Sequence, residues 1–247
     1  MKKPLNYFTM FVMAAIICFV YVSCGQHETS PNTLTKKEIK EGWQLLFDGT
    51  TTNGWKGYNQ KSFPEHGWTV ENGTLRCLAS GRGEAGSGGD IITEKKFKNF
   101  EFKLEWKIAK AGNSGIMYLV TELPGQPAWH GAPEMQILDG KNFPTELKPN
   151  QLSGSLYDLV AANPQNVKPF GEWNQIKIAV KDNTVEHWQN GEMVVNYQLR
   201  TSGWEDMVKN SKFKDYPEFL NLASEGHICI QDHGSDVWFK NIKIREL

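Results

Sequence analysis

The amino-acid sequence predicts an all-β fold in which two antiparallel sheets pack together as a sandwich. Apolar and polar residues alternate with a period of two in several segments, and turn residues separate these segments. The only segment with convincing helical periodicity is short and lies at residues 204–211. About two hundred residues, from Glu41 to Leu247, are enough for one such sandwich with a single core.

Residues 1–23 are predicted to be the signal peptide of a bacterial lipoprotein. Two lysines precede an apolar stretch at 8–22, which is too short to span a membrane comfortably. A small residue, Ser23, then directly precedes Cys24, as in lipoprotein signals. We expect Cys24 to carry the lipid, with an ordinary signal peptide and an incidental cysteine as the alternative. The expected location is the cell envelope of a Gram-negative bacterium, lipid-anchored and facing the periplasm or the surface.

Residues 24–40 are polar and lack core periodicity, so they are predicted to form a tether, and the folded domain is expected at 41–247. Without the signal peptide the chain has 25 basic and 28 acidic residues, a net charge of −3. The sequence shows no basic patch, so a nucleic-acid partner is not expected.

Cys77 and Cys229 are the cysteines that remain in the predicted domain, and both lie in apolar, strand-like segments. Two buried thiols on separate strands are favoured, because nothing in the sequence brings the two residues within bridging distance. A disulfide in an oxidising periplasm is the alternative. The chain has no CxxC, no HExxH and no spacing typical of a zinc site.

The segment 101–108 alternates strictly, which predicts a strand with one face in the core. Its apolar residues are expected to be buried and its charged residues exposed: Phe102, Leu104 and Trp106 against Glu101, Lys103 and Glu105. Two strands at 174–180 and 185–189 follow, with a turn at 182–183 between them, and Asn190-Gly191 favours a type I′ hairpin after them. The last strand changes phase between Phe239 and Ile242, which predicts a β-bulge at 240–241.

The segment 81–86 matches the G-x-G-x-x-G spacing of dinucleotide-binding folds, but its context is wrong for that function. The motif requires a helix to open after the glycines, whereas here the chain continues into the strand-like Ile91-Ile92-Thr93. We therefore interpret residues 81–89 as a loop.

Several segments, in this order along the chain, resemble the 3-keto-disaccharide hydrolase family. These are 42–49 with Gly54-Trp55, Asp90-Ile91-Ile92-Thr93, Gly112-Asn113-Ser114-Gly115-Ile116, Pro133-Glu134-Met135-Gln136-Ile137-Leu138-Asp139, Gly171-Glu172-Trp173-Asn174, 226–234 and 237–242. The resemblance implies a concanavalin A-like jelly roll with a concave, sugar-facing surface. It also implies an enzyme that acts on glycosides oxidised to a ketone at carbon 3, working downstream of a glycoside 3-dehydrogenase. The loops at 81–89 and 122–132 are where substrate choice is expected to vary.

A ketone at carbon 3 acidifies the proton on carbon 2, so a base can remove it and the group on carbon 1 can leave by elimination. Hydration of the unsaturated sugar then completes a net hydrolysis. This route needs a base, an electrophile for the enolate oxygen and a proton donor. Direct displacement would instead need two carboxyl groups across the scissile bond.

Strand parity supplies the candidate residues. Glu134 and Gln136 face away from Met135 and Ile137, and Gln231 and His233 share one face of the segment 227–233. We predict Glu134 as base, His233 as proton donor, and Gln136 and Gln231 as residues that orient the sugar. The alternative is that these are ordinary wet faces of antiparallel strands.

Six further residues are candidates for sugar contact because of their polarity or aromatic rings. They are Asp90, Asn113, Trp129, His130, Tyr157 and Asp158. Asp232 has the opposite parity to Gln231 and is expected to fix a turn or a neighbouring strand. His66, His187 and His27 are expected to be structural, exposed or part of the tether.

Asp90, Glu134, Asp139, His130 and His233 include residue types that bind divalent cations, but no spacing defines a metal site. A non-catalytic carbohydrate-binding lipoprotein is the main alternative function, because the same sandwich serves lectins. A structural envelope lipoprotein would show no dependence on sugar at all. The combination of a carboxylate with an imidazole favours the enzyme.

Overall fold

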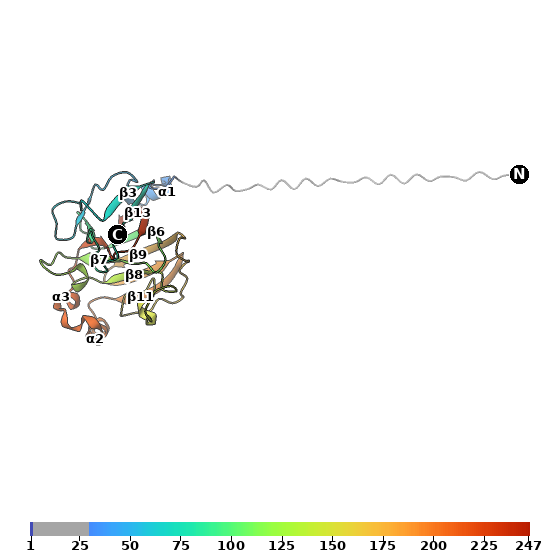
Figure 1. Ribbon diagram of the computed structural model, residues 1–247. Coiled ribbons are helices and arrows are strands. Elements are labelled where there is room, and N and C mark those ends of the chain that lie inside the picture. Colours follow the sequence, from blue (N-terminus) through green and yellow to red (C-terminus); the bar gives the residue numbers. More distant parts are fainter. Residues whose placement is uncertain (2–29) are drawn as a thin grey trace.

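The computed structural model describes residue 1 and residues 30–247 (Figure 1). The predicted signal peptide and Cys24 lie outside the described residues. None of the helices in the described part of the chain is long and apolar enough to cross a membrane.

Two antiparallel sheets form the domain, as predicted. In the described residues the larger sheet has eight strands, in the order β11 (Glu192–Gln198), β10 (Thr184–Gln189), β9 (Asn174–Lys181), β6 (Phe100–Ile108), β13 (Val237–Glu246), β4 (Thr74–Cys77) and β3 (Trp68–Glu71), with β1 (Gln44–Leu45) paired to β13. The smaller sheet has five, in the order β2 (Trp55–Gly57), β5 (Ile91–Thr93), β12 (His227–Ile230), β7 (Asn113–Val120) and β8 (Glu134–Leu138).

The core lies between the sheets and is built by the alternation within each strand. Phe102, Leu104 and Trp106 on β6 are all buried in it, which confirms the predicted inner face of this strand. The smaller sheet contributes Ile116, Met135 and other residues of the same parity. Residues of the opposite parity on β7, β8 and β12 therefore point to the outside of the sandwich.

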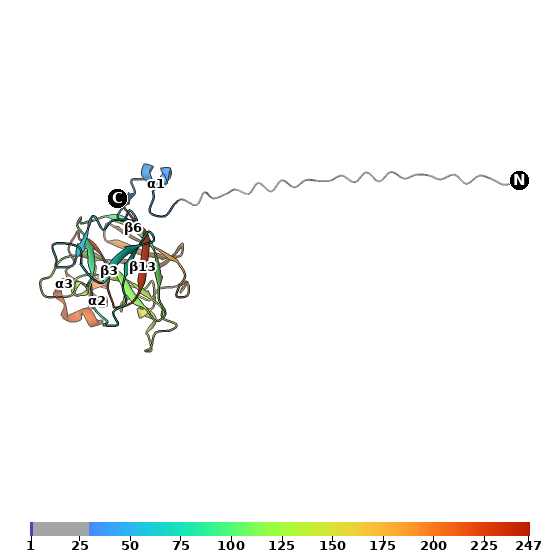
Figure 2. The same cartoon turned by 45° about the horizontal axis from the view of Figure 1, so that its top comes forward.

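Residues between 30 and 40 belong to the described fold, although the folded domain was expected only from Glu41. Helix α1 (Lys36–Lys40) lies at one end of the molecule, away from α2 and α3 (Figures 1 and 2). Its Glu38 carboxylate accepts hydrogen bonds from Lys103 at 2.6 Å and from Lys243 at 3.0 Å. Lys103 is consequently half-buried under α1, although it was expected to be exposed. The sequence pattern missed this segment because polar contacts hold it, with no apolar periodicity. Glu101 and Glu105, which were also expected to be exposed, are half-buried in ion pairs with Lys177 and Lys240.

The turns follow the predicted chemistry. Asn190 and Gly191 both have positive φ, 49° and 88°, as a type I′ hairpin requires. The register of β13 against β6 shifts between Lys240 and Lys243, with Asn241 at φ 53°, which confirms the bulge.

Short helices decorate one end of the sandwich (Figure 1). They are α2 (Ser202–Lys209), η3 (Lys212–Asp215) and α3 (Pro217–Leu220), with η1 (Ala128–His130) and η2 (Pro149–Gln151) in the loops beside β8. Helix α2 is the predicted helix, beginning two residues earlier, and it buries Trp204 and Val208.

Cys77 and Cys229 are free and buried. They lie on β4 and β12, in different sheets, and Cys229 belongs to a separate apolar cluster on the outer side of the smaller sheet. His187 is structural, as expected: it is fully buried, and its ring nitrogens contact the Tyr118 hydroxyl at 2.8 Å and the Gly154 carbonyl at 3.1 Å. His66 is exposed.

Candidate active site

The predicted site residues lie on the outer face of the smaller sheet. Met135 and Ile137 of β8 enter the core, so Glu134 and Gln136 project from the opposite face, and the same parity brings Gln231 to that face from the end of β12. These positions are not solvent-exposed, as the outer face of an ordinary antiparallel sheet would be. Glu134, Gln136 and Gln231 are only 7%, 3% and 7% exposed. The alternative of a solvated strand face is therefore wrong for these three residues.

A glycine at the middle of this face leaves room between the two glutamines. Gly115 of β7 pairs with Gln136 on one side, and its carbonyl accepts a hydrogen bond from the Gln231 backbone amide at 3.0 Å on the other. A Cβ atom at Gly115 would lie 1.9 Å from Oε1 of Glu134. The Glu134 carboxylate thus occupies the space that any other residue at position 115 would fill. Gly115 belongs to the family-like segment at 112–116, but its role in leaving space for the Glu134 carboxylate was not predicted.

The Glu134 carboxyl group has an unusually high pKa. Burial raises its pKa from 4.5 to about 8, and the negative charges of Asp90 and Glu84 act in the same direction. The Lys212 ammonium acts in the opposite direction. A carboxylate of this basicity, once ionised, is well suited to remove a proton from carbon near neutral pH.

Lys212 is a site residue that the sequence did not reveal. It is the first residue of η3, and its ammonium lies 4.4 Å from the ring centre of Tyr157 and 4.8 Å from that of Trp129. Partial burial lowers its pKa, whereas Glu134 and Asp158 raise it. Although the residue as a whole is exposed, its charged end is held by aromatic rings next to the buried acid. A lysine in a polar segment far from every motif carries no pattern that would predict this role.

Trp129 and His130 come from the loop before β8, through the single turn of η1. The His130 ring lies against Tyr216, with 4.1 Å between ring centres, and its Nδ1 is 3.0 Å from Oε1 of Gln126. Burial lowers the pKa of His130, so the neutral imidazole is favoured. The indole nitrogen of Trp129 is buried and has no hydrogen-bond partner among the described residues, which leaves a donor available to a ligand.

Asp90 and Asp232 lie at the side of this face that adjoins the glycine-rich loop at 81–89. The Asp90 carboxylate accepts a hydrogen bond from the Asp232 backbone amide at 2.9 Å, and burial raises its pKa to about 7. The fully buried Asp232 carboxylate accepts hydrogen bonds from the amides of Gly88, Gly89 and Gly234, at 3.0, 3.2 and 2.9 Å. Asp232 therefore fixes a turn, as expected, and also holds the glycine-rich loop against the sheet.

The glycine-rich loop at 81–89 runs directly into β5 without a helix, so the dinucleotide-binding motif is excluded by its context. The loop carries Glu84, whose charge acts on Glu134 and Asp90. This loop was expected to influence substrate choice, but Glu84 within it was not among the predicted site residues.

His233 and Asn113 lie toward the glycine-rich loop. Across the sheet, Glu134 is level with Met117 and Cys229, and His233 lies four residues beyond Cys229, away from Glu134. The carbonyl of Gly234, next to His233, accepts hydrogen bonds from the amides of Ser80 and Gly81. Asn113 has a buried Oδ1 without a partner in the described part of the chain. The structure thus gathers Glu134 with Trp129, His130, Tyr157 and Asp158 around Lys212. Four other candidates lie toward the glycine-rich loop: Asp90, Asn113, Gln231 and His233. Gln136, paired with Gly115, lies between the two groups. The pairing of Glu134 with His233 stays a prediction.

The residues suggested for a divalent cation do not form a cluster in the described structure. No group of three or more His, Cys, Asp or Glu that could hold a metal ion occurs among residues 30–247. Asp139 is engaged locally, where it accepts hydrogen bonds from the Ala111 amide at 2.8 Å and from the Asn142 side chain.

Comparisons with known proteins identify the family of this chain. Residues 42–245 match the family model described as the 3-keto-alpha-glucoside-1,2-lyase-like domain. A curated protein of Bacteroides thetaiotaomicron named 3-keto-disaccharide hydrolase is 46% identical over 230 residues, which cover 84% of this chain and 79% of the relative.

Solved structures support the same fold. A crystal structure from Parabacteroides distasonis, of a protein provisionally assigned as a glycosyl hydrolase, superposes with a TM-score of 0.81 at 35% identity, over 88% of this chain and all of that one. A second such structure from the same organism has a TM-score of 0.61 at 26% identity, over 79% of this chain and all of that one.

Proposed function

Because this chain belongs to the 3-keto-alpha-glucoside-1,2-lyase-like domain family, we propose that it is an enzyme that cleaves 3-keto-disaccharides and related 3-keto-glycosides. The observation that carries the proposal is the Glu134 carboxyl group. It is buried, has a pKa raised to about 8, and lies over Gly115 next to a lysine ammonium. A module that only binds sugar has no need of a buried acid tuned in this way.

In the proposed reaction the ionised Glu134 removes the proton on carbon 2, and the electron pair of that bond moves toward the ketone to form an enolate. The Lys212 ammonium favours this step because its positive charge lies near the site of the developing negative charge. The bond from carbon 1 to the glycosidic oxygen then breaks, and the departing oxygen takes up a proton. Addition of water across carbons 1 and 2 gives the 3-keto sugar, so the net reaction is hydrolysis.

His233 is the proposed donor of the proton to the leaving group, and Gln136 and Gln231 are proposed to orient the sugar. Oε1 of Gln136 already accepts a hydrogen bond from the Ile137 amide at 3.1 Å, so its NH₂ group remains for a sugar oxygen. His130 is the second imidazole at the site and the competing candidate for the donor. Separate His233→Asn and His130→Asn variants distinguish the two, since the true donor matters most for substrates with poor leaving groups.

The proposed setting is the cell envelope, with a lipid on Cys24, a cleaved signal peptide and residues up to about 30 as the tether. The substrate would be supplied by an enzyme that oxidises carbon 3 of a glycoside. The proposed tether is shorter than residues 24–40, because Asn32 and helix α1 already contact the domain.

The test is release of the aglycone from a 3-keto-glucoside by the purified domain, with the matching 3-hydroxy glucoside as control. Deuterium at carbon 2 should slow the reaction if proton removal limits the rate, and the Glu134→Gln variant should lose about a hundredfold or more in turnover while still binding the sugar. Binding without turnover by the wild type would instead identify a non-catalytic carbohydrate-binding protein. Equal turnover by Glu134→Gln would remove Glu134 from the mechanism.

A further inference from the structure

A groove next to the candidate active site is not used by the chemistry described above. It lies between β11, α2 and the segment around η2, and its volume is about 590 Å³. This volume falls within the range of roughly 300–1,000 Å³ that is typical of small-molecule sites. Leu159 and Met207 contribute accessible apolar surface, and most of the other lining residues are polar. Trp204 lies beneath this surface and is only 1% exposed.

The groove and the active site share a boundary. Asp158 lines the groove, and its negative charge acts on both Lys212 and Tyr157 at the active site. Ser211 also lines the groove and immediately precedes Lys212 in the chain. The Lys212 ammonium and the Glu134 carboxylate in turn affect each other's pKa. The Tyr157 amide also donates a hydrogen bond to the Glu134 carbonyl at 3.0 Å, and Asp158, the next residue, lines the groove. The groove therefore lies directly beside the strand that carries Glu134.

Several polar groups in the groove lack protein partners. Oδ1 of Asn150 is buried and accepts no hydrogen bond from the described residues. The side chains of Gln198 and Asp206 also line the groove; they are exposed to solvent and make no hydrogen bond within residues 30–247, so the cost of a buried, unpaired acceptor applies to Asn150 alone. A buried acceptor without a donor costs about 1–3 kcal/mol, so a ligand that offers hydroxyl groups is favoured over an apolar one.

We propose that this groove is the leaving-group subsite, which binds the second sugar of a 3-keto-disaccharide. The inference rests on the proposed function, because it takes the oxidised sugar to lie at Glu134. The unpartnered groups include the amide oxygen of Asn150 and the carboxylate of Asp206, which are acceptors that match the hydroxyl donors of a neutral sugar. The partly exposed apolar surface of Leu159 and Met207 matches the carbon faces of a sugar ring.

The experiment compares two substrates across three variants. The substrates are a 3-keto-disaccharide and an aryl 3-keto-glucoside, whose leaving group carries no hydroxyl donors equivalent to those of a sugar. Asn150→Ala and Asp206→Ala remove groove acceptors without removing a side-chain hydrogen bond of the described fold. Glu205→Ala is the matched control: it is the neighbouring acid on α2, it lines a different cavity, and its partner is Lys209 at 3.4 Å.

Each groove variant should lose about tenfold in kcat/KM on the disaccharide, the equivalent of one lost hydrogen bond of about 1.4 kcal/mol, and less than about twofold on the aryl substrate. The control should match the wild type on both. Free glucose, as a mimic of the leaving group, should inhibit the groove variants more weakly than the wild type. Equal losses on both substrates, or no loss on the disaccharide, would overturn the subsite. A wild type inactive on both substrates would refute the proposed function itself, and this inference with it.

Discussion

Replacing Glu134 by Gln should stabilise the protein, and the gain should depend on pH. The ordinary pKa of 4.5 applies to the unfolded chain, and the folded value is about 8. Because folding raises the pKa of this carboxyl group, the free energy of unfolding is unaffected by it below pH 4.5, where both states are protonated. The free energy of unfolding then falls as pH rises from 4.5 through about 8. At pH 7 the unfolded carboxyl is ionised while the folded one is still mostly protonated.

The magnitude follows from the two pKa values. At pH 7 the difference favours the unfolded state by about 3 kcal/mol, and well above pH 8 by about 5 kcal/mol, at about 1.4 kcal/mol per pKa unit. Glu134→Gln removes this titration while nearly keeping the shape of the side chain. For a domain of this size about 3 kcal/mol corresponds to a rise in Tm of roughly 6–12 °C.

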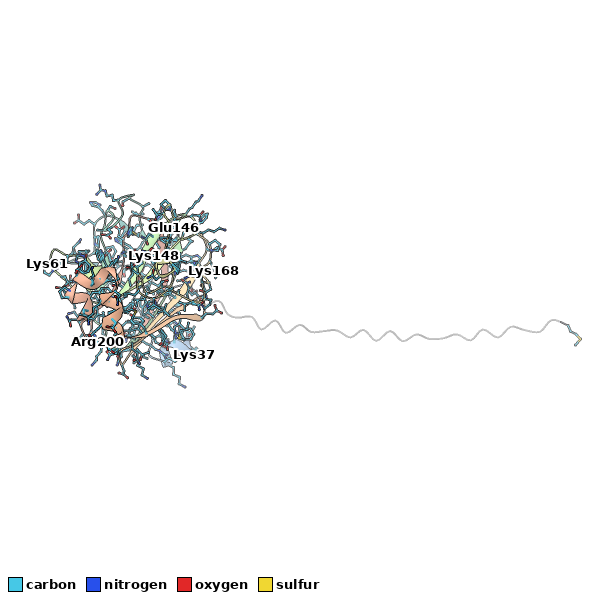
Figure 3. All side chains as sticks on the ribbon, turned by 90° about the horizontal axis from the view of Figure 1, so that it is seen from below. Lys37, Lys61, Glu146, Lys148, Lys168 and Arg200 are labelled. Atoms are coloured by element: carbon cyan, nitrogen blue, oxygen red, sulfur yellow. The ribbon has the colours of Figure 1, made fainter. Side chains whose placement is uncertain are left out.

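The assay is urea or thermal unfolding of the wild type and the variant at pH 5, 7 and 9. Glu146→Gln is the control, because Glu146 lies on the surface and is exposed (Figure 3). The stability difference between Glu134→Gln and the wild type should grow steadily with pH, and the control should follow the wild type. A difference that is constant with pH, or a wild type that is more stable at pH 9, would refute the burial argument for Glu134. A gain in stability with a loss of turnover is the trade-off expected of a catalytic group held in an unfavourable environment.

Four other perturbations test separate parts of the structure. Gly115→Ala should lower turnover at least tenfold, because the new Cβ would lie 1.9 Å from the Glu134 carboxylate, and near-normal kinetics would show that this contact is not needed. Lys212→Gln should lower kcat on 3-keto substrates by about ten- to a hundredfold with a smaller effect on KM, and it should raise the pH at which activity appears, since the charge that favours the ionised Glu134 is lost. His187 has a pKa lowered to about 4 by burial, so the wild type should lose about 3 kcal/mol of stability as pH falls from 6.5 toward 4, and His187→Gln should flatten that limb of the unfolding curve. Cys24→Ser should move the protein from the membrane fraction to the soluble fraction with its fold intact, and retention in the membrane would argue against lipidation there.

Which face each strand residue occupies could be predicted from sequence pattern alone. Alternation within β6 was sufficient to predict that Phe102, Leu104 and Trp106 are buried, and the same parity separated Glu134 from Met135. These features are local, because successive side chains of a strand point to opposite sides whatever the rest of the chain does. The turn at Asn190-Gly191 was equally predictable, since its backbone conformation depends on two residues.

The surroundings of those faces depend on how distant segments of the chain pack together. The outer face of β8 is buried because the loops beside it fold over the sheet, and the pKa of Glu134 depends on that cover and on charges from residues 84, 90 and 212. Lys212 lies 78 positions along the chain from Glu134, and no periodicity links the two. The docking of α1 through Glu38 is likewise a set of polar contacts between distant residues. Strand periodicity records which residues share a face, whereas burial, charge proximity and the groove beside α2 arise only when distant segments pack together.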